Sequence, residues 1–288
     1  MLTKRLKYFA PVVAAAVTVV IAAPVAQAET SVQFGTGFEY SSGEYGDTEE
    51  TTIYEIPFSV RLKSGNWSFR ARVPVASVEG PGGVVPGDDN GGDRVDNSGS
   101  GSSGGGGDDD DDLGGGGTLA GLSDEIGLAD ITLSGTYTFD LSDKTYLDVT
   151  TKVSLPTGDE AKDLGTGETD ISVNAELGAD TDFGGVYLQG GYKQRGGALR
   201  EDGAQAVAGA YARLTDGVLF GADVSWAEAS RLGADDFSSA TAYTSFRLTD
   251  SLRLSLFAET GLTDASPDFG AGIGLTWKTN FRRPFSGN

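Results

Sequence analysis

The chain has 288 residues, 44 of them glycine, and a formal net charge of −21. It contains no cysteine, which excludes disulfides and thiolate chemistry, and no histidine, which removes the usual general base and the commonest zinc ligand. The acidic balance argues against nucleic acid as a partner, because phosphate binding needs clustered lysine and arginine.

The first 28 residues have the pattern of a secretory signal peptide. Lys4, Arg5 and Lys7 precede an apolar stretch from about 8 to 25, and residues 26–28 read A-Q-A, an A-x-A cleavage signal. A membrane anchor is the alternative, but the apolar stretch is short and contains two prolines. We therefore expect 1–28 to be a signal peptide and 29–288 to form the mature chain.

Period-two alternation dominates the mature chain. In 66–79, Trp67, Phe69 and Val73 fall on one face, whereas Arg70 and Arg72 fall on the other. Twelve such segments are predicted as strands, and most are 10–13 residues long, the length of a tilted strand crossing a bilayer. The ranges are 31–40, 51–63, 66–79, 128–140, 144–155, 168–178, 185–195, 203–214, 217–228, 237–248, 251–262 and 268–278.

The connections alternate between short turns and long polar loops. This asymmetry is typical of an outer-membrane barrel, whose short turns face the periplasm and whose long loops face outside. We therefore predict an all-β protein, a transmembrane antiparallel up-and-down β-barrel of twelve strands. The even strand count places both termini in the periplasm. On this plan 80–127 is an extracellular loop with no reason to order, and 279–288 is a C-terminal tail.

The two faces of the predicted strands differ in a way that favours this barrel over a soluble β-sandwich or lipocalin-like barrel. One face is apolar and almost free of charge, with aromatic residues near the strand ends that suit interfacial girdles. The other face carries nine basic and five acidic residues, too many charges for a dry core and suited to a wet lumen. These predicted lumen-lining residues are Glu55, Arg61, Arg70, Arg72, Asp148, Lys152, Glu176, Lys193, Arg195, Arg213, Asp223, Arg247, Arg253 and Glu259.

Three stretches carry a resemblance to a known family: YEIPFSVRLKSGNWSFRARVPVASVEGPGGVVPG, GLADITLSGTYTFD and VSLPTGDEAKDLGTGETD. They resemble proteobacterial outer-membrane barrels labelled as transporters and are similar to the family named after the meta-pathway of phenol degradation. The most specific part is L-P-T-G-D at 155–159 followed by L-G-T-G at 164–167. The resemblance implies a barrel that passes small molecules, and it brings no site residues.

The last predicted strand also resembles the C-terminal assembly signal of outer-membrane barrels. Gly272, Leu275 and Trp277 stand where those barrels carry a glycine, a hydrophobic residue and an aromatic residue, although this chain runs on for eleven residues. We accordingly expect the barrel assembly machinery, outer-membrane lipid and lipopolysaccharide as partners, with small-molecule solutes in the lumen and the cell outer membrane as the location.

An enzyme is not expected. Without histidine, the hydrolase and acyltransferase mechanisms usual in such barrels have no base. A paired-carboxylate mechanism stays open for Asp148 and Glu176, which we place on strands that are next but one to each other. We favour the simpler interpretation that these two carboxylates balance the charge of nearby cations. The basic excess in the lumen favours a pore that prefers polar or weakly anionic solutes. The alternative is a barrel whose interior is closed by salt bridges and which interacts with cations or partners at its surface.

Two acidic loops raise the question of metals, and no cofactor is expected. Loop 80–127 holds eleven acidic residues and one arginine, and it accounts for −10 of the net charge. Its run Asp108, Asp109, Asp110, Asp111 and Asp112 can attract divalent cations loosely, but the nine-residue repeat of a calcium β-roll is missing. The carboxylates of 156–170 do not have EF-hand spacing, so a solvated loop is favoured over a calcium site there.

Overall fold

The structure is a computed structural model that describes residues 30–80, 84–86, 126–198, 200–231 and 233–281. The predicted signal peptide, most of loop 80–127 with Asp108–Asp112, and residues 282–288 lie outside the described residues. Within the described ranges, no helix is long and apolar enough to cross a membrane.

Twelve long antiparallel strands and one very short one make up the described chain, with a single 3-10 turn at Glu160–Lys162. The strands are β1 (Thr30–Gly43), β2 (Thr51–Ser64), β3 (Trp67–Glu79), β4 (Gly127–Leu128), β5 (Ile131–Asp140), β6 (Thr145–Leu155), β7 (Asp170–Thr181), β8 (Gly184–Gln194), β9 (Gly203–Thr215), β10 (Val218–Ala227), β11 (Phe237–Arg247), β12 (Leu252–Gly261) and β13 (Phe269–Phe281).

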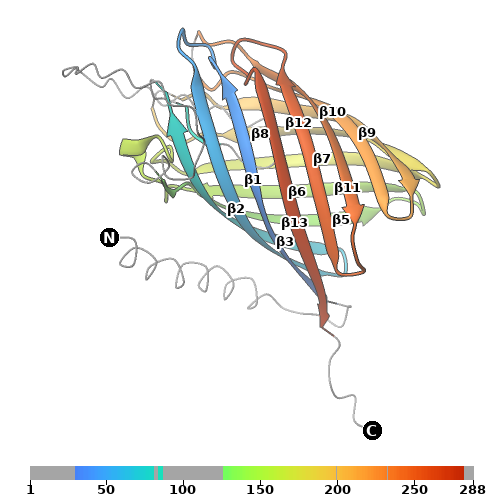
Figure 1. Cartoon of the computed structure of the whole chain (residues 1–288). Helices are drawn as coiled ribbons and strands as arrows, with labels where there is room; N and C mark the ends of the chain where they lie inside the picture. Colours follow the sequence, from blue (N-terminus) through green and yellow to red (C-terminus); the bar gives the residue numbers. More distant parts are fainter. Residues whose placement is uncertain (1–29, 81–83, 87–125, 199, 232, 282–288) are drawn as a thin grey trace, which may run out of the picture.

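The sheet closes on itself through the first and last strands. Each long strand pairs with its neighbours in sequence, and β1 pairs with both β2 and β13, from Thr30 opposite Phe281 to Ser42 opposite Phe269. Closure leaves no open edge, as a bilayer requires. The predicted twelve-stranded up-and-down barrel is therefore confirmed, and Figure 1 shows the tilted strands wrapping around it. The extra strand β4 adds two residues that pair with Val75 and Ala76 of β3.

Two of the differences from the predicted ranges concern the C-terminal tail and the long loop. β13 continues through Phe281, so the segment predicted as a tail from 279 begins inside the last strand. Its final residues pair with the start of β1, a partner that the alternation of a single strand does not reveal. β4 lies at the end of the predicted loop 80–127, and Val84 and Val85 within that loop are buried.

The barrel wall has its apolar face outside. Leu177, Val186 and Leu188 are 53%, 58% and 61% exposed, whereas Lys193 on the inward face is only 6% exposed. A soluble barrel has the opposite arrangement, because its apolar side chains must leave water. The outer wall therefore needs an apolar surrounding, and the membrane barrel rather than the soluble one fits the fold.

Aromatic side chains gather at both ends of the outer face. At one end Trp67 and Phe139 flank Tyr137, with ring centroids 4.8 and 4.6 Å from it. At the other end the ring of Tyr40 lies 5.5 Å from Tyr54 and 6.5 Å from Phe269. Phe34, which stacks on Trp277 near the first end, is six residues from Tyr40 along β1, about 20 Å of strand. That spacing suits two interfacial girdles.

We call the two ends of the barrel the short-turn end and the long-loop end. The connections β2–β3, β5–β6, β7–β8, β9–β10 and β11–β12 lie at the short-turn end, and the longer connections lie at the other. Thr30 pairs with both Ser64 and Phe281, so the first and last described residues lie at the short-turn end. Figure 1 shows β1 and β13 side by side at this end.

Candidate solute-binding lumen

A cavity of about 360 Å³ lies inside the barrel, on the polar side of the strands. Five of its lining residues are basic and two are acidic, and the remainder are amides or hydroxyls. The lining comprises Gln33, Arg61, Lys63, Asn66, Ser68, Arg70, Arg72, Thr132, Ser134, Thr136, Thr138, Asp148, Thr150, Lys152, Asn174, Glu176 and Gln189. The absence of apolar residues from this lining makes the cavity a place for water and polar solutes.

Strand register collects the basic residues into a patch. Arg61 on β2 lies directly opposite Arg70 on β3, and Lys63 opposite Ser68. Arg70 is opposite Ser134 on β5, which is in turn opposite Lys152 on β6. Directly opposed like charges repel each other across a sheet, so Arg61 and Arg70 concentrate positive charge at one place on the wall. Arg61, Arg70 and Lys63 form what we call the basic patch.

A second pair of like charges lies on the neighbouring wall of the same cavity. Asp148 on β6 is the direct cross-strand partner of Glu176 on β7, so the prediction that they lie on strands next but one to each other is wrong. The Tyr146 hydroxyl donates to Glu176 Oε1 at 2.9 Å. We call Asp148 and Glu176 the acidic pair. Thr136, Thr138 and Thr150 line the cavity between this pair and the basic patch.

Tyrosines extend the acidic wall around the barrel. Tyr187 donates to Asp223 Oδ2 at 2.9 Å and lies 3.4 Å from the Tyr243 hydroxyl. The rings of Tyr146, Tyr187 and Tyr243 lie over glycines on adjacent strands, where an added Cβ would overlap the ring. These tyrosines are not among the lumen residues predicted from charge. Their position on the polar face of the strands, next to inward glycines, is the sequence feature that could have identified them.

Toward the long-loop end, the interior carries buried charges. Arg72 forms an ion pair with Glu55 and lies 3.4 Å from Glu39, while Lys193 Nζ lies 3.3 Å from Asp170 Oδ2. The buried charged side chains all lie at mid-barrel or in the long-loop half, and they are Glu55, Arg72, Lys152, Asp170, Lys193, Arg195 and Glu259. At the short-turn end, by contrast, Arg61 and Lys63 are exposed. The long-loop half of the interior is therefore lined by buried ion pairs, whereas the short-turn half carries exposed cations.

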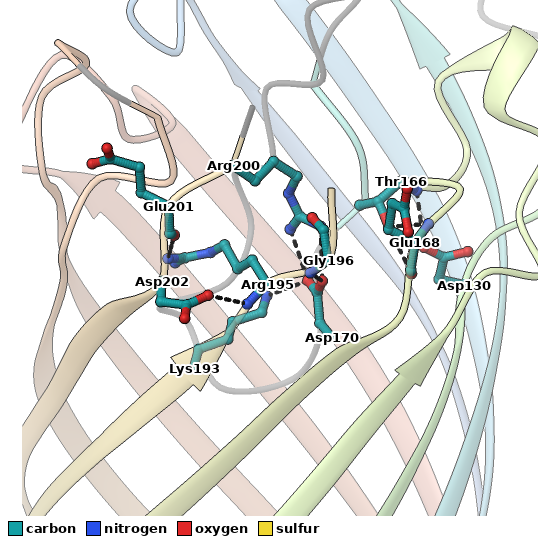
Figure 2. A network of polar contacts seen from close by, with 10 residues as sticks. All are labelled: Asp130, Thr166, Glu168, Asp170, Lys193, Arg195, Gly196, Arg200, Glu201 and Asp202. Carbon is teal, nitrogen blue, oxygen red and sulfur yellow. Dashed lines mark hydrogen bonds and ion pairs between the residues drawn. The ribbon is translucent and has the colours of Figure 1, made fainter. Parts of the chain in front are cut away.

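Asp170 is the centre of the second of these groups of ion pairs. Its two carboxylate oxygens accept from the guanidinium of Arg200 at 2.7 Å each, and Oδ1 also accepts from the Gly196 amide at 3.0 Å. Beside it, the Arg195 guanidinium donates to the Glu201 carbonyl at 2.7 Å, and the Arg195 amide donates to Asp202 at 2.8 Å. Figure 2 shows the network pinning the connection between β8 and β9 against β7.

Asp130 organises the loop that carries the L-P-T-G-D and L-G-T-G motifs. Its Oδ1 accepts from the amides of Thr157 and Gly158 at 3.0 and 2.8 Å, and its Oδ2 accepts from the Thr166 amide at 3.0 Å. A Cβ on Gly158 would overlap the Leu164 carbonyl, and Leu164 itself is fully buried. Gly158 of the motif is therefore required by the close packing of the loop. Figure 2 shows Thr166 beside Asp130.

The acidic residues of this loop do not gather around a metal position. The Asp170 carboxylate forms ion pairs with Arg200 and Lys193. Within the described ranges, no group of three residues of the metal-binding types lies close enough together to hold a metal ion. The loop is built on hydrogen bonds from backbone amides to the Asp130 carboxylate, and the expectation that it holds no calcium site stays a prediction.

The fourteen predicted lumen residues fall into three groups. Arg61, Arg70, Arg72, Asp148, Lys152 and Glu176 line the cavity. Glu55, Lys193, Arg195 and Glu259 are buried in the long-loop half, with Arg195 in the loop just after β8, and Asp223 accepts from Tyr187. Arg213, Arg247 and Arg253 are exposed at the short-turn end, where Arg213 lies 5.2 Å from the Tyr211 ring centroid. Lys63, Asp170 and Arg200 were missed, since they stand at strand ends or in loops.

No protein-family model and no curated protein matches the chain. Among solved structures, it is similar to an outer membrane channel from Pseudomonas putida F1, with a TM-score of 0.59 and 12% identity over 90% of this chain and 97% of that one. It is also similar to the NanC porin, with a TM-score of 0.53 and 10% identity over 85% and 100% of the two chains. The translocator domain of the autotransporter NalP from Neisseria meningitidis matches with a TM-score of 0.50 and 11% identity over 95% of each. The chain therefore has the fold of an outer-membrane channel barrel.

Proposed function

We propose that the protein is an outer-membrane channel that passes small polar or weakly anionic solutes through its charged lumen, without catalysing a reaction. The observation that carries this proposal is the cavity, which is lined by polar residues with a basic excess and enclosed in a barrel with an apolar outer face. The similarity to an outer membrane channel and to a porin supports the same role.

Anion preference follows from the lining charges. Five basic residues against two acidic ones give the cavity a positive excess, which raises the local concentration of anions and lowers that of cations. The side chains of Arg61 and Lys63 are exposed at the short-turn end, so their field acts on a solute that enters there. Lipid, lipopolysaccharide and the assembly machinery are the partners this role requires, with the short-turn end and both termini in the periplasm.

A closed barrel with a surface role is the second candidate. The buried ion pairs around Asp170 and Arg72 favour it, because they match the salt-bridged interior expected of a closed barrel. In that case the lumen holds water but does not conduct.

A liposome-swelling assay separates the two. Vesicles that contain the folded barrel should swell in isotonic solutions of small sugars or small carboxylates, faster for the smaller solute of each kind. Swelling no faster than that of protein-free vesicles, with a barrel shown to be folded by its heat-modifiable gel shift, would rule out the channel.

A further inference from the structure

The lumen cavity presents two opposite charges to one space. The basic patch lies at the β2–β3 pair and the acidic pair at the β6–β7 pair, and both line the same 360 Å³. The basic patch and the acidic pair are separated along the wall by β5, whose inward side chains all carry hydroxyl groups: Thr132, Ser134, Thr136 and Thr138. A solute in this cavity therefore meets cations on β2 and β3, the acidic pair on β6 and β7 with Lys152 also on β6, and a hydroxyl-bearing surface between them.

Each patch consists of directly opposed like charges. Arg61 faces Arg70 across one strand pair, and Asp148 faces Glu176 across another. The two carboxylates of the acidic pair repel each other, and an ammonium group would relieve that repulsion, while the basic patch attracts a carboxylate. Two carboxylates are too few for a calcium site, and no metal-type cluster occurs within the described ranges. An ammonium group, which needs only acceptors, suits the acidic pair better.

Hydrogen-bonding groups beside the acidic pair point to a ligand that both donates and accepts. Asn174 is only 3% exposed and lines the cavity one step from Glu176 on the same face of β7. Its Oδ1 accepts from Gln205, but within the described residues its Nδ2 has no acceptor. Likewise Asp148 Oδ1 is buried and receives no hydrogen bond from any described residue. Buried polar groups are normally paired, so each such atom marks a place for a polar partner.

We propose that this cavity is a binding site for small dipolar solutes of dipeptide size, with the carboxylate held at the basic patch and the ammonium at the acidic pair. The inference rests on the proposed function for the entry of solute, and it names the solute class. The threonine hydroxyls, Asn174 and Gln189 supply donors and acceptors for an amide between the two charged ends. The site selects for the presence of both charges, since only a solute that carries both can contact the basic patch and the acidic pair together.

The test is isothermal titration calorimetry on the full chain purified in detergent, with three probes of similar size. Diglycine carries both charges, N-acetylglycine only the carboxylate and glycinamide only the ammonium. We expect diglycine to bind at least tenfold more tightly than either of the others. Equal affinities of diglycine and N-acetylglycine would overturn the proposal in the unmodified protein, without reliance on any variant.

Variants then assign the two ends of the solute. Asp148→Asn combined with Glu176→Gln keeps the side-chain shapes and should reduce diglycine affinity to that of N-acetylglycine, whose own affinity changes less than twofold. Asp250→Asn, in an exposed turn between β11 and β12, is the matched control and should change neither. Undiminished preference for diglycine in the double variant would overturn the assignment. Calorimetric binding in a barrel that fails the swelling assay would keep this site and refute the channel, so the two failures are distinguishable.

Discussion

The ion pairs of Asp170 give the sharpest prediction for stability. Asp170 and Arg200 are 4% and 8% exposed, and two 2.7 Å hydrogen bonds join them. Asp170→Asn removes the carboxylate charge that pairs with the buried side chains of Arg200 and Lys193. Breaking a buried pair in this way costs about 3–5 kcal/mol. The lower figure corresponds to roughly a hundredfold change in the unfolding equilibrium.

The assay is reversible urea unfolding of the barrel in detergent micelles, followed by tryptophan fluorescence. Asp182→Asn is the matched control, because it removes the same charge from an ion pair with Lys144 at 2.9 Å whose side chains are 89% and 59% exposed. Exposed pairs contribute less than about 1 kcal/mol, so this variant should unfold almost as the original does.

A double-mutant cycle isolates the interaction between the two residues. Arg200→Gln alone should also destabilise the barrel, and the double variant should lose less than the sum of the two single losses. The expected coupling is about 1–3 kcal/mol. If Asp170→Asn were no more destabilising than Asp182→Asn, the network in Figure 2 would not hold the long-loop end together, and the stabilising role that we assign to the Asp170 ion pairs would be wrong.

Three further predictions test the closure, the lumen and the long loop. Gly37→Ala should impair folding, because the added Cβ would overlap a backbone carbonyl of β13, where β1 and β13 close the barrel. Gly190→Ala should fold normally, because no atom lies within 4 Å of the added Cβ. The heat-modifiable gel shift measures the folding of both variants. Arg61→Gln with Arg70→Gln should lower the rate of swelling in small carboxylates relative to sugars, and an unchanged ratio would contradict the role of the basic patch. Deleting 90–117 should leave folding intact, since the entropy cost of closing a loop grows only slowly with its length; failure of this variant to assemble would show that the segment has a structural role.

The architecture was predictable from the sequence because a strand has only two faces. Once Trp67 and Phe69 are assigned to the outer face, Arg70 and Arg72 must lie on the inner one, and the same rule holds on every long strand. The alternation of short and long connections then fixes the up-and-down order. The number of long strands needed only a count of alternating segments.

The site was less predictable because it depends on register between strands. Nothing in the isolated β6 and β7 segments shows that Asp148 and Glu176 become direct partners, since a slip of two residues would separate them and keep both inside. The network of Asp170 depends on Arg200, which lies in a loop outside the alternation. The hydrogen bonds of Asp130 likewise depend on backbone amides, whose direction a sequence does not display.

The most direct test of the central claim is single-channel recording of the folded barrel in a planar bilayer under a salt gradient. The account predicts discrete conductance steps and a reversal potential on the anion-selective side, which moves toward zero when Arg61 and Arg70 are both replaced by glutamine. A folded barrel that gives no conductance steps, or one that selects for cations, would contradict the proposal that its lumen is a pathway for polar and weakly anionic solutes.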